Sequence, residues 1–256
     1  MTIYHTGCAG FVKPRERYTA RLDYVEFDLR APTPSPKVLA TWKKHRPENF
    51  TYGVVAPASL YGDASWPLRD PAKVRSELDR LCNNIDALGA RVVVLRTPMA
   101  VSPGSVALGR LTPVLERLVK VAPVVVWEPS GLWEREAAVA YAQKLGVVVA
   151  CDPLHDEVAE PIAYARMRGL GVDRRYHVGR LEEIATKLAV CDEAFVVFES
   201  GSAWREALGF TGVAQGVGAE AMLDGEEADD EDGDDEDEDE GDEDGDFEDD
   251  DEEDEG

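Results

Sequence analysis

The sequence predicts a small α/β protein of the (β/α)8 TIM-type barrel class, followed by a disordered acidic C-terminal tail. Short apolar, β-branched segments recur eight times, and most of them are followed by a segment with helical spacing of apolar residues. Alternating strands and helices are typical of a parallel sheet, and eight units in about 220 residues fit the small end of the barrel's size range. A doubly wound open sheet is the alternative. It is disfavoured because YHTGCAGF, after the first strand, contains GxxG and lacks the GxGxxG of a dinucleotide fold.

Each predicted strand is a short run rich in apolar and β-branched residues. The valines of PVVVWE illustrate the pattern, because a continuous apolar run is expected where helices cover one face of a sheet and a core fills the other. The eight strands are expected at 2–6, 22–28, 50–56, 91–96, 123–128, 146–151, 162–168 and 194–199.

The predicted helices lie between these strands. The clearest pattern is in 71–88, where one apolar stripe contains Val74, Leu78, Leu81, Ile85 and Leu88. Asp70 before Pro71 marks the start of this helix, and Gly89 marks its end. Further helices are expected at 105–120, 132–145 and 179–190, with shorter ones at 36–45 and 202–208, whereas no clear helix follows the first or the sixth strand.

The net charge of −25 comes from the C-terminal end. From Asp224 onward there are 26 of the 52 acidic residues and none of the 27 basic ones, so residues 1–223 are close to neutral. A segment so acidic cannot bury enough apolar surface to fold, and it is expected to be disordered. The sequence therefore predicts a barrel over 1–215 and a tail over 216–256. The tail is expected to keep the protein in solution, to bind a basic protein, or to bind cations weakly.

Several functional classes are disfavoured by composition. No apolar run reaches the roughly 18–20 residues of a membrane span, and the N-terminus lacks the features of a secretory signal. The four cysteines have no CxxC spacing, which favours reduced thiols in the cytoplasm. Nucleic acid is not expected as a partner, because phosphate binding requires a basic surface.

Charged residues stand at the expected strand ends, where a barrel places its site. Strand alternation puts Glu128 on the face of Val124 and Val126, with Trp127 on the opposite face. The predicted ligand-binding set, with Glu128 and Glu26 as the candidate catalytic acid or base, contains Glu26, Asp28, Glu128, Trp133, Asp152, Arg166, Arg168 and Glu199.

Other interpretations of these residues stay open. A purely structural cluster of Glu26, Glu128 and Arg166 explains the same charges, because buried carboxylates persist by pairing. Two opposed carboxylates would suit a glycosidase. A metal site using Glu26, Asp152, His155 and Glu199 is disfavoured by the few histidines, and Cys8 is expected to be a buried thiol, not a nucleophile. No cofactor is indicated.

Four segments resemble the YecE-like family, a domain of unknown function (DUF72) whose members are TIM-type barrels. They are HTGCAGF, YVEFD with TWKKHRPENFTYGVVAP, WEPSGLW, and AYARMRGLG with AFVVFESGSAWREAL, and together they span residues 3 to 208. The resemblance implies a barrel fold with Glu26, Glu128, Asp152 and Arg166 retained. It implies no particular reaction, since the family has none assigned.

The sequence departs from the family's pattern at the expected mouth of the barrel. Ser130 replaces an arginine, Arg168 replaces a histidine, Glu199 and Ser200 replace a pair of asparagines, and Val55 replaces a lysine. A ligand different from that of typical members, or a divergent barrel with weakened activity, would explain these changes. We expect either a small polar or anionic ligand at the mouth, turned over by hydrolysis or isomerisation, or a non-enzymatic scaffold that acts through its acidic tail.

Overall fold

The computed structural model describes residues 1–29, 34–63, 65–158, 161–169 and 175–223. They belong to one compact unit, Met1–Leu223. The predicted disordered tail covers residues 216–256, and its part from residue 224 onward lies outside the described residues. The predicted domain boundary after residue 215 falls between the last α-helix and a short 3-10 turn, η2 (Glu220–Met222), which is part of the compact unit.

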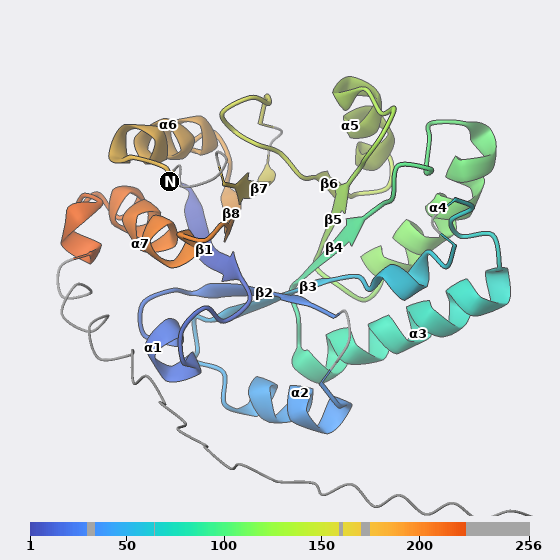
Figure 1. Ribbon diagram of the computed structural model, residues 1–256, viewed down its shortest axis with the longest axis horizontal. Helices are drawn as coiled ribbons and strands as arrows, with labels where there is room; N and C mark the ends of the chain where they lie inside the picture. Colours follow the sequence, from blue (N-terminus) through green and yellow to red (C-terminus); the bar gives the residue numbers. More distant parts are fainter. Residues whose placement is uncertain (30–33, 64, 159–160, 170–174, 224–256) are drawn as a thin grey trace, which may run out of the picture. The chain divides into compact units, whose positions relative to one another are not determined.

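Eight parallel strands form the centre of the molecule (Figure 1). They are β1 (Ile3–Ala9), β2 (Tyr24–Asp28), β3 (Thr51–Val55), β4 (Val92–Arg96), β5 (Val124–Glu128), β6 (Val148–Val149), β7 (Ile162–Arg168) and β8 (Glu193–Glu199). Their order in the sheet is β6-β5-β4-β3-β2-β1-β8-β7. Cys151 closes the ring, because its N–H donates to Tyr164 O (2.9 Å) and its carbonyl accepts from Arg166 N (3.1 Å). The strands therefore form a barrel, as predicted, and not an open sheet.

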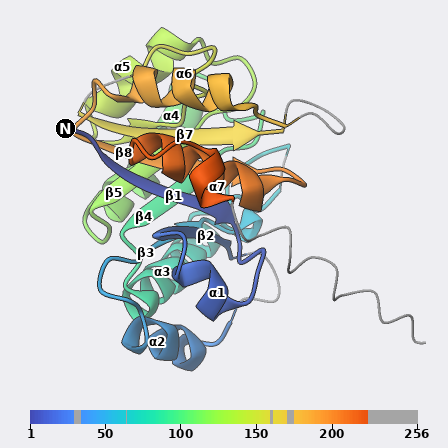
Figure 2. The same cartoon turned by 90° about the vertical axis from the view of Figure 1, so that its left-hand side faces the viewer.

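The helices lie outside the strands (Figures 1 and 2). They are α1 (Arg15–Thr19), α2 (Pro36–Lys44), α3 (Pro71–Leu88), α4 (Ser105–Val119), α5 (Arg135–Gln143), α6 (Val178–Leu188) and α7 (Ala203–Ala214). The expected limits of α3 are confirmed. Asp70 caps it by accepting from Ala72 N and Lys73 N, and Gly89 ends it with a φ of 65°.

Several elements differ from the sequence prediction. β1 continues to Ala9, beyond the expected end at residue 6, and the short helix α1 follows it where no clear helix was expected. The last helix continues to Ala214, beyond the expected end at residue 208, because Gly209 and Gly212 serve close packing. A Cβ at Gly212 would stand 2.2 Å from Gly218 O. The sixth strand has only two residues plus the bridge at Cys151, shorter than the expected 146–151. No helix follows it in the described part of residues 150–161, in line with the weak pattern there.

The alternation predicted along the strands is confirmed by two separate apolar clusters. The cluster inside the barrel contains Tyr24, Val92, Val94, Val124, Val126, Tyr164, Phe195 and Val197. Trp127 and Val125 pack instead in the larger cluster between strands and helices. Gly53 provides room inside the barrel, since a Cβ there would stand 1.9 Å from the Tyr24 hydroxyl. The inner surface is therefore filled by apolar side chains up to the level at which the charged residues begin.

Candidate functional site

The charged residues gather where the strands end. Glu26, Arg96, Glu128, Arg166 and Glu199 each occupy an inward position near the carboxyl end of a strand. The strand register pairs Arg96 with Glu128 and Arg168 with Glu199. Because all strands are parallel, these side chains meet at one end of the barrel, which we call the mouth.

Arg166 is the centre of the charged cluster. Its Nη2 lies 2.5 Å from Glu26 Oε1, its Nη1 lies 2.9 Å from Glu199 Oε2, and its Nε lies 3.1 Å from Glu128 Oε2. The side chain is only 3% exposed. Burial alone would lower the pKa of Arg166, but the Tyr164 hydroxyl and the carboxylates of Glu26 and Glu199 raise it above its usual value. Arg166 thus stays charged and has its nitrogen atoms directed at carboxylates.

Glu26 lies beneath the mouth. Its side chain is 1% exposed, one oxygen binds Arg166 and the other accepts from the Tyr164 hydroxyl. Burial, followed by the negative charge of Glu26, raises the pKa of both Tyr164 and Tyr24 well above the usual range, so both phenols stay protonated. Glu26 therefore serves to hold Arg166, and its position gives it no access to the pocket.

Glu128 reaches the pocket itself. Its side chain is 13% exposed, and Arg168 donates to its Oε1. Its Oε2 lies 3.1 Å from Arg166 Nε and 3.4 Å from Arg96 Nε. Neither pair has the alignment of a hydrogen bond, and Oε2 has no hydrogen-bonding partner among the described residues. Oε2 is thus buried between two guanidinium groups, and Glu128 lines the mouth as an ion-paired side chain.

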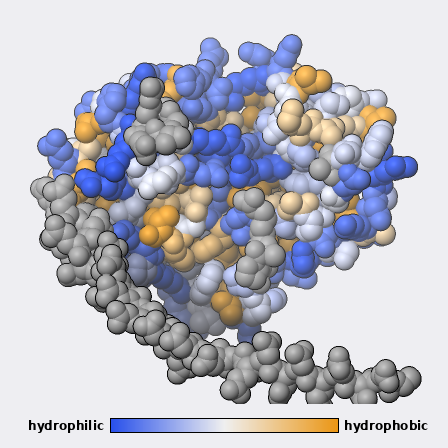
Figure 3. Space-filling model, viewed as in Figure 1, coloured by the Kyte–Doolittle hydropathy of each residue, from blue (hydrophilic) through white to orange (hydrophobic). Residues whose placement is uncertain are grey.

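The mouth has two lobes that share Arg96. The first, of about 370 Å³, is lined by Arg96, Glu128, Ser130, Trp133, Arg135, Asp152, Asp156, Arg166 and Arg168, among others. The second, of about 300 Å³, is lined by Asp28, Val55, Ala56, Ala58, Tyr61, Arg96 and Glu199. The Tyr61 hydroxyl is buried and has no partner in the part of the chain that is described. Figure 3 shows one face of the molecule, on which hydrophilic residues are frequent and hydrophobic residues are scattered among them.

The predicted ligand-binding residues are brought to this end of the barrel. Trp133 stands in the first lobe, where its indole N–H donates to Val101 O (2.7 Å) and its ring packs edge-on against Trp127. Asp152 lines the same lobe and accepts from Leu154 N, whereas Asp28 lines the second lobe. The structural cluster of Glu26, Glu128 and Arg166 considered above is also present, so structural and ligand-facing positions coexist.

Three residues of the mouth were not predicted. Arg96 links both lobes and lies 3.6 Å from Glu199 through its Nη1. Strand alternation could have found it, because VVVLR places Arg96 on the face of Val92 and Val94. Tyr61 directly follows a 3-10 turn after β3, and Arg135 pairs with Asp156 at 3.2 Å. Neither has a sequence signal that would place it at the mouth.

The structure also describes residues that were considered for other roles. Among the described residues, no group of three or more His, Cys, Asp or Glu side chains is arranged to hold a metal ion. Cys8 is fully buried, and burial raises the pKa of its thiol to about 12, which disfavours a nucleophilic thiolate. No helix within the described ranges is long and apolar enough to cross a membrane.

These features define the protein as a TIM-type barrel: the parallel strands form a closed ring. The candidate site lies at the carboxyl ends of the strands, where such barrels place their sites. Solved structures agree with this class. The fold is similar to that of a DUF72 family protein from Enterococcus faecalis V583, with a TM-score of 0.64 and 14% identity over 83% of this chain and 96% of that one. This fold similarity agrees with the resemblance found in the sequence.

Sugar epimerases share the fold as well. An L-ribulose 3-epimerase gives a TM-score of 0.55 at 15% identity, covering 88% of this chain and 98% of that one. A D-tagatose 3-epimerase-like protein gives 0.54 at 11% identity, covering 83% and 96%. No family model matches the sequence, and no curated protein is significantly similar to it. At these identities the similarity extends to the fold alone.

Proposed function

We propose that the chain is a divergent YecE-like barrel that binds a small hydroxylated, polar or anionic molecule at its mouth and isomerises it, with Glu128 as the proton acceptor. The observation that carries the proposal is the position of Glu128, which lines the first lobe together with Arg96, Arg166 and Arg168. The sugar epimerases with the same fold support this substrate class by analogy of fold. The four cysteines, all free and buried, support a cytoplasmic location.

The proposed chemistry is proton transfer next to a carbonyl. Glu128, ion-paired with Arg166 and Arg168, is a carboxylate, which is the form that a general base requires. It takes the proton from the carbon beside the carbonyl, and the electron pair of the broken C–H bond moves to the carbonyl oxygen. Arg96 and Arg168 line the same lobe and stabilise the negative charge that develops there. Return of the proton to the neighbouring carbon, with transfer of the hydroxyl proton between the two oxygens, completes the isomerisation.

Exchange with solvent tests this proposal directly. The protein would be incubated in D2O with aldoses, ketoses and their phosphates, and NMR would detect deuterium at the carbon beside the carbonyl. We expect exchange with at least one compound and a loss of about 100-fold or more in Glu128→Gln, the usual range for removing a general base. Glu136→Gln, at an exposed position on α5, is the matched control and should keep full exchange. Equal exchange in Glu128→Gln would exclude Glu128 as the base.

The second candidate function is a non-enzymatic module whose acidic tail binds a basic protein. It is favoured by the structural role of Arg166, which is directed at three carboxylates of the chain itself. The tail supports it by composition, with 26 acidic residues and no basic residue from Asp224 onward. Absence of exchange with every compound, together with binding of a basic peptide by the tail, would favour this function.

A further inference from the structure

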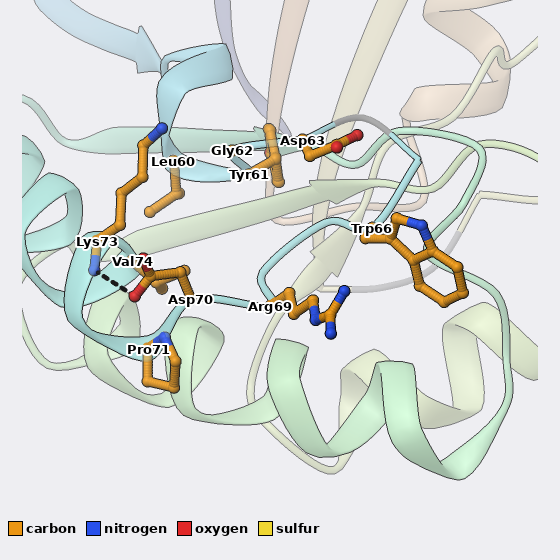
Figure 4. A pocket seen from close by; sticks show the side chains of 10 residues that line it. All are labelled: Leu60, Tyr61, Gly62, Asp63, Trp66, Arg69, Asp70, Pro71, Lys73 and Val74. Atoms are coloured by element: carbon orange, nitrogen blue, oxygen red, sulfur yellow. Dashed lines mark hydrogen bonds between the residues drawn. The ribbon is translucent and has the colours of Figure 1, made fainter.

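A third pocket, of about 560 Å³, lies beside the mouth (Figure 4). It lies between η1 (Ala58–Leu60) and the first turn of α3, and it contains none of the charged residues of the two lobes. Tyr61 lines both this pocket and the second lobe. The lining residues are Leu60, Tyr61, Gly62, Asp63, Trp66, Arg69, Asp70, Pro71, Lys73 and Val74.

An exposed aromatic ring forms one side of this pocket. Trp66 is 60% exposed, and the guanidinium carbon of Arg69 lies 5.9 Å from the centre of its ring. Figure 4 shows Arg69 extending toward Trp66. An indole with this much accessible surface offers a flat apolar face on which another ring can stack.

The backbone holds the loop in this arrangement. Leu68 has a φ of 59°, which is unusual for a residue other than glycine, and its N–H donates to Tyr61 O at 2.8 Å. Its side chain is buried, at 4% exposure. With Leu68 turned inward, its neighbours Trp66 and Arg69 remain on the outside, where they line the pocket.

Arg69 and Lys73 are the charged groups of the pocket that a ligand can bind, because the two carboxylates of the pocket already accept hydrogen bonds. Asp63 accepts from Ser65 N at 2.8 Å, and Asp70 accepts from Ala72 N and Lys73 N, so both carboxylates are bound to the loop's own backbone. Within the described ranges, neither Arg69 nor Lys73 has a carboxylate at ion-pair distance. In Figure 4 the Lys73 side chain lies beside Leu60, across the pocket from Trp66. The pocket thus combines a stacking surface with two cationic groups that form no ion pair with the described part of the chain.

We propose that this pocket is a second binding site, for an aromatic ring that carries a phosphate group, as in a nucleoside monophosphate. The ring would stack on Trp66, since an indole accepts any planar base. Arg69 would bind the phosphate through its paired N–H donors, and Lys73 would add positive charge from the opposite wall. This binding does not depend on the reaction proposed at the mouth.

Calorimetric titration of the full chain with adenosine 5′-monophosphate tests the proposal, with adenosine and inorganic phosphate as partial probes. We expect the nucleotide to bind at least tenfold more tightly than either partial probe. Trp66→Ala should weaken binding about tenfold or more because the stacking surface is lost, and Arg69→Gln should weaken it about tenfold or more because the phosphate contact is lost. Both side chains are exposed, so neither change should affect folding.

Two controls separate this site from the rest of the surface. Arg75→Gln, at an exposed position on α3, removes an equal charge outside the pocket, and Arg168→Gln removes one from the mouth. Both should leave nucleotide affinity within about twofold of the unmodified protein. The proposal is overturned if the nucleotide does not bind, or if Arg168→Gln lowers nucleotide affinity as much as Arg69→Gln does. It is also overturned if a sugar phosphate binds as tightly as the nucleotide and Trp66→Ala leaves nucleotide affinity unchanged.

Discussion

Arg166 and Glu128 show how one cluster combines structural and ligand-facing positions. Arg166 is 3% exposed and contacts Glu26, Glu128 and Glu199. Transfer of a guanidinium from water is costly, and here the carboxylates and the Tyr164 hydroxyl offset that cost. The Glu128 side chain is 13% exposed, so Arg166 fixes the position of a residue that is more accessible to a ligand than Arg166 itself.

Removal of the Arg166 charge should therefore be strongly destabilising. We expect Arg166→Met to lower the free energy of unfolding by about 3–5 kcal/mol, because Glu26 would become a buried carboxylate without a counter-ion. Arg168→Met, at a side chain that is 57% exposed, should cost less than about 1 kcal/mol. Urea unfolding of both variants measures the difference. A loss below about 1 kcal/mol in Arg166→Met would contradict the assigned structural role, and adding Glu26→Gln should recover part of the loss.

At the scale of elements, the strands are joined at their amino ends by a second ionic group. His5 of β1 lies between two carboxylates, with Nε2 at 2.8 Å from Glu193 Oε1 and Nδ1 at 3.5 Å from Asp23 Oδ2. The second contact lacks hydrogen-bond alignment. Arg91 binds both oxygens of Glu193, at 2.5 and 2.8 Å, and approaches His5 at 3.3 Å. This group could not be predicted from the sequence, because its members come from β1, β8 and the residues before β2 and β4.

This arrangement predicts a pH dependence of stability. Burial would lower the pKa of His5, but Asp23 and Glu193 outweigh it, and the pKa is raised above 6.5. A raised pKa in the folded state means that protonated His5 contributes stability below about pH 6.5, and that this contribution is lost as the pH rises through the folded value. We therefore expect the free energy of unfolding of the unmodified protein, compared with His5→Gln, to fall from pH 6 to pH 8. His155→Gln, whose side chain is 75% exposed, is the control. A constant difference between pH 5 and pH 9 would contradict the assignment.

Elements whose pattern is local were predictable, and those set by packing were not. The valine runs of β4 and β5 and the apolar stripe of α3 identify these elements, because each is buried along a regular face. The end of α7 depends on Gly209, where a Cβ would approach Leu181 Cδ1 at 3.0 Å. The length of β6 depends on its pairing with β7 at Cys151. Both are contacts between segments far apart in the sequence.

For the whole molecule, the order of the strands could be predicted from the alternation of strands and helices along the sequence. The contacts between side chains inside the mouth could not. Strand ends indicated that Glu26, Glu128 and Arg166 would lie at one end of the barrel, and they do. Alternation gives the face of each side chain but not its depth, so the sequence could not separate Glu26, 1% exposed, from Glu128, 13% exposed. It also could not show that Arg96 stands between two lobes, because the lobes are lined by side chains from strands far apart in the sequence.

The negative charge of the chain is concentrated in the tail, from Asp224 onward. The residues before Asp224 are close to neutral, and the hydrophobic core lies among them. Deletion of 224–256 should therefore leave the melting temperature nearly unchanged while it removes all of the net negative charge, since 26 acidic and 27 basic residues remain. If the tail binds a basic protein, the full chain should bind a polylysine peptide in fluorescence anisotropy, more weakly as salt rises, and the shortened chain should not. Equal binding by the shortened chain would assign the interaction to the barrel, where the carboxylates of the mouth are already paired with arginines.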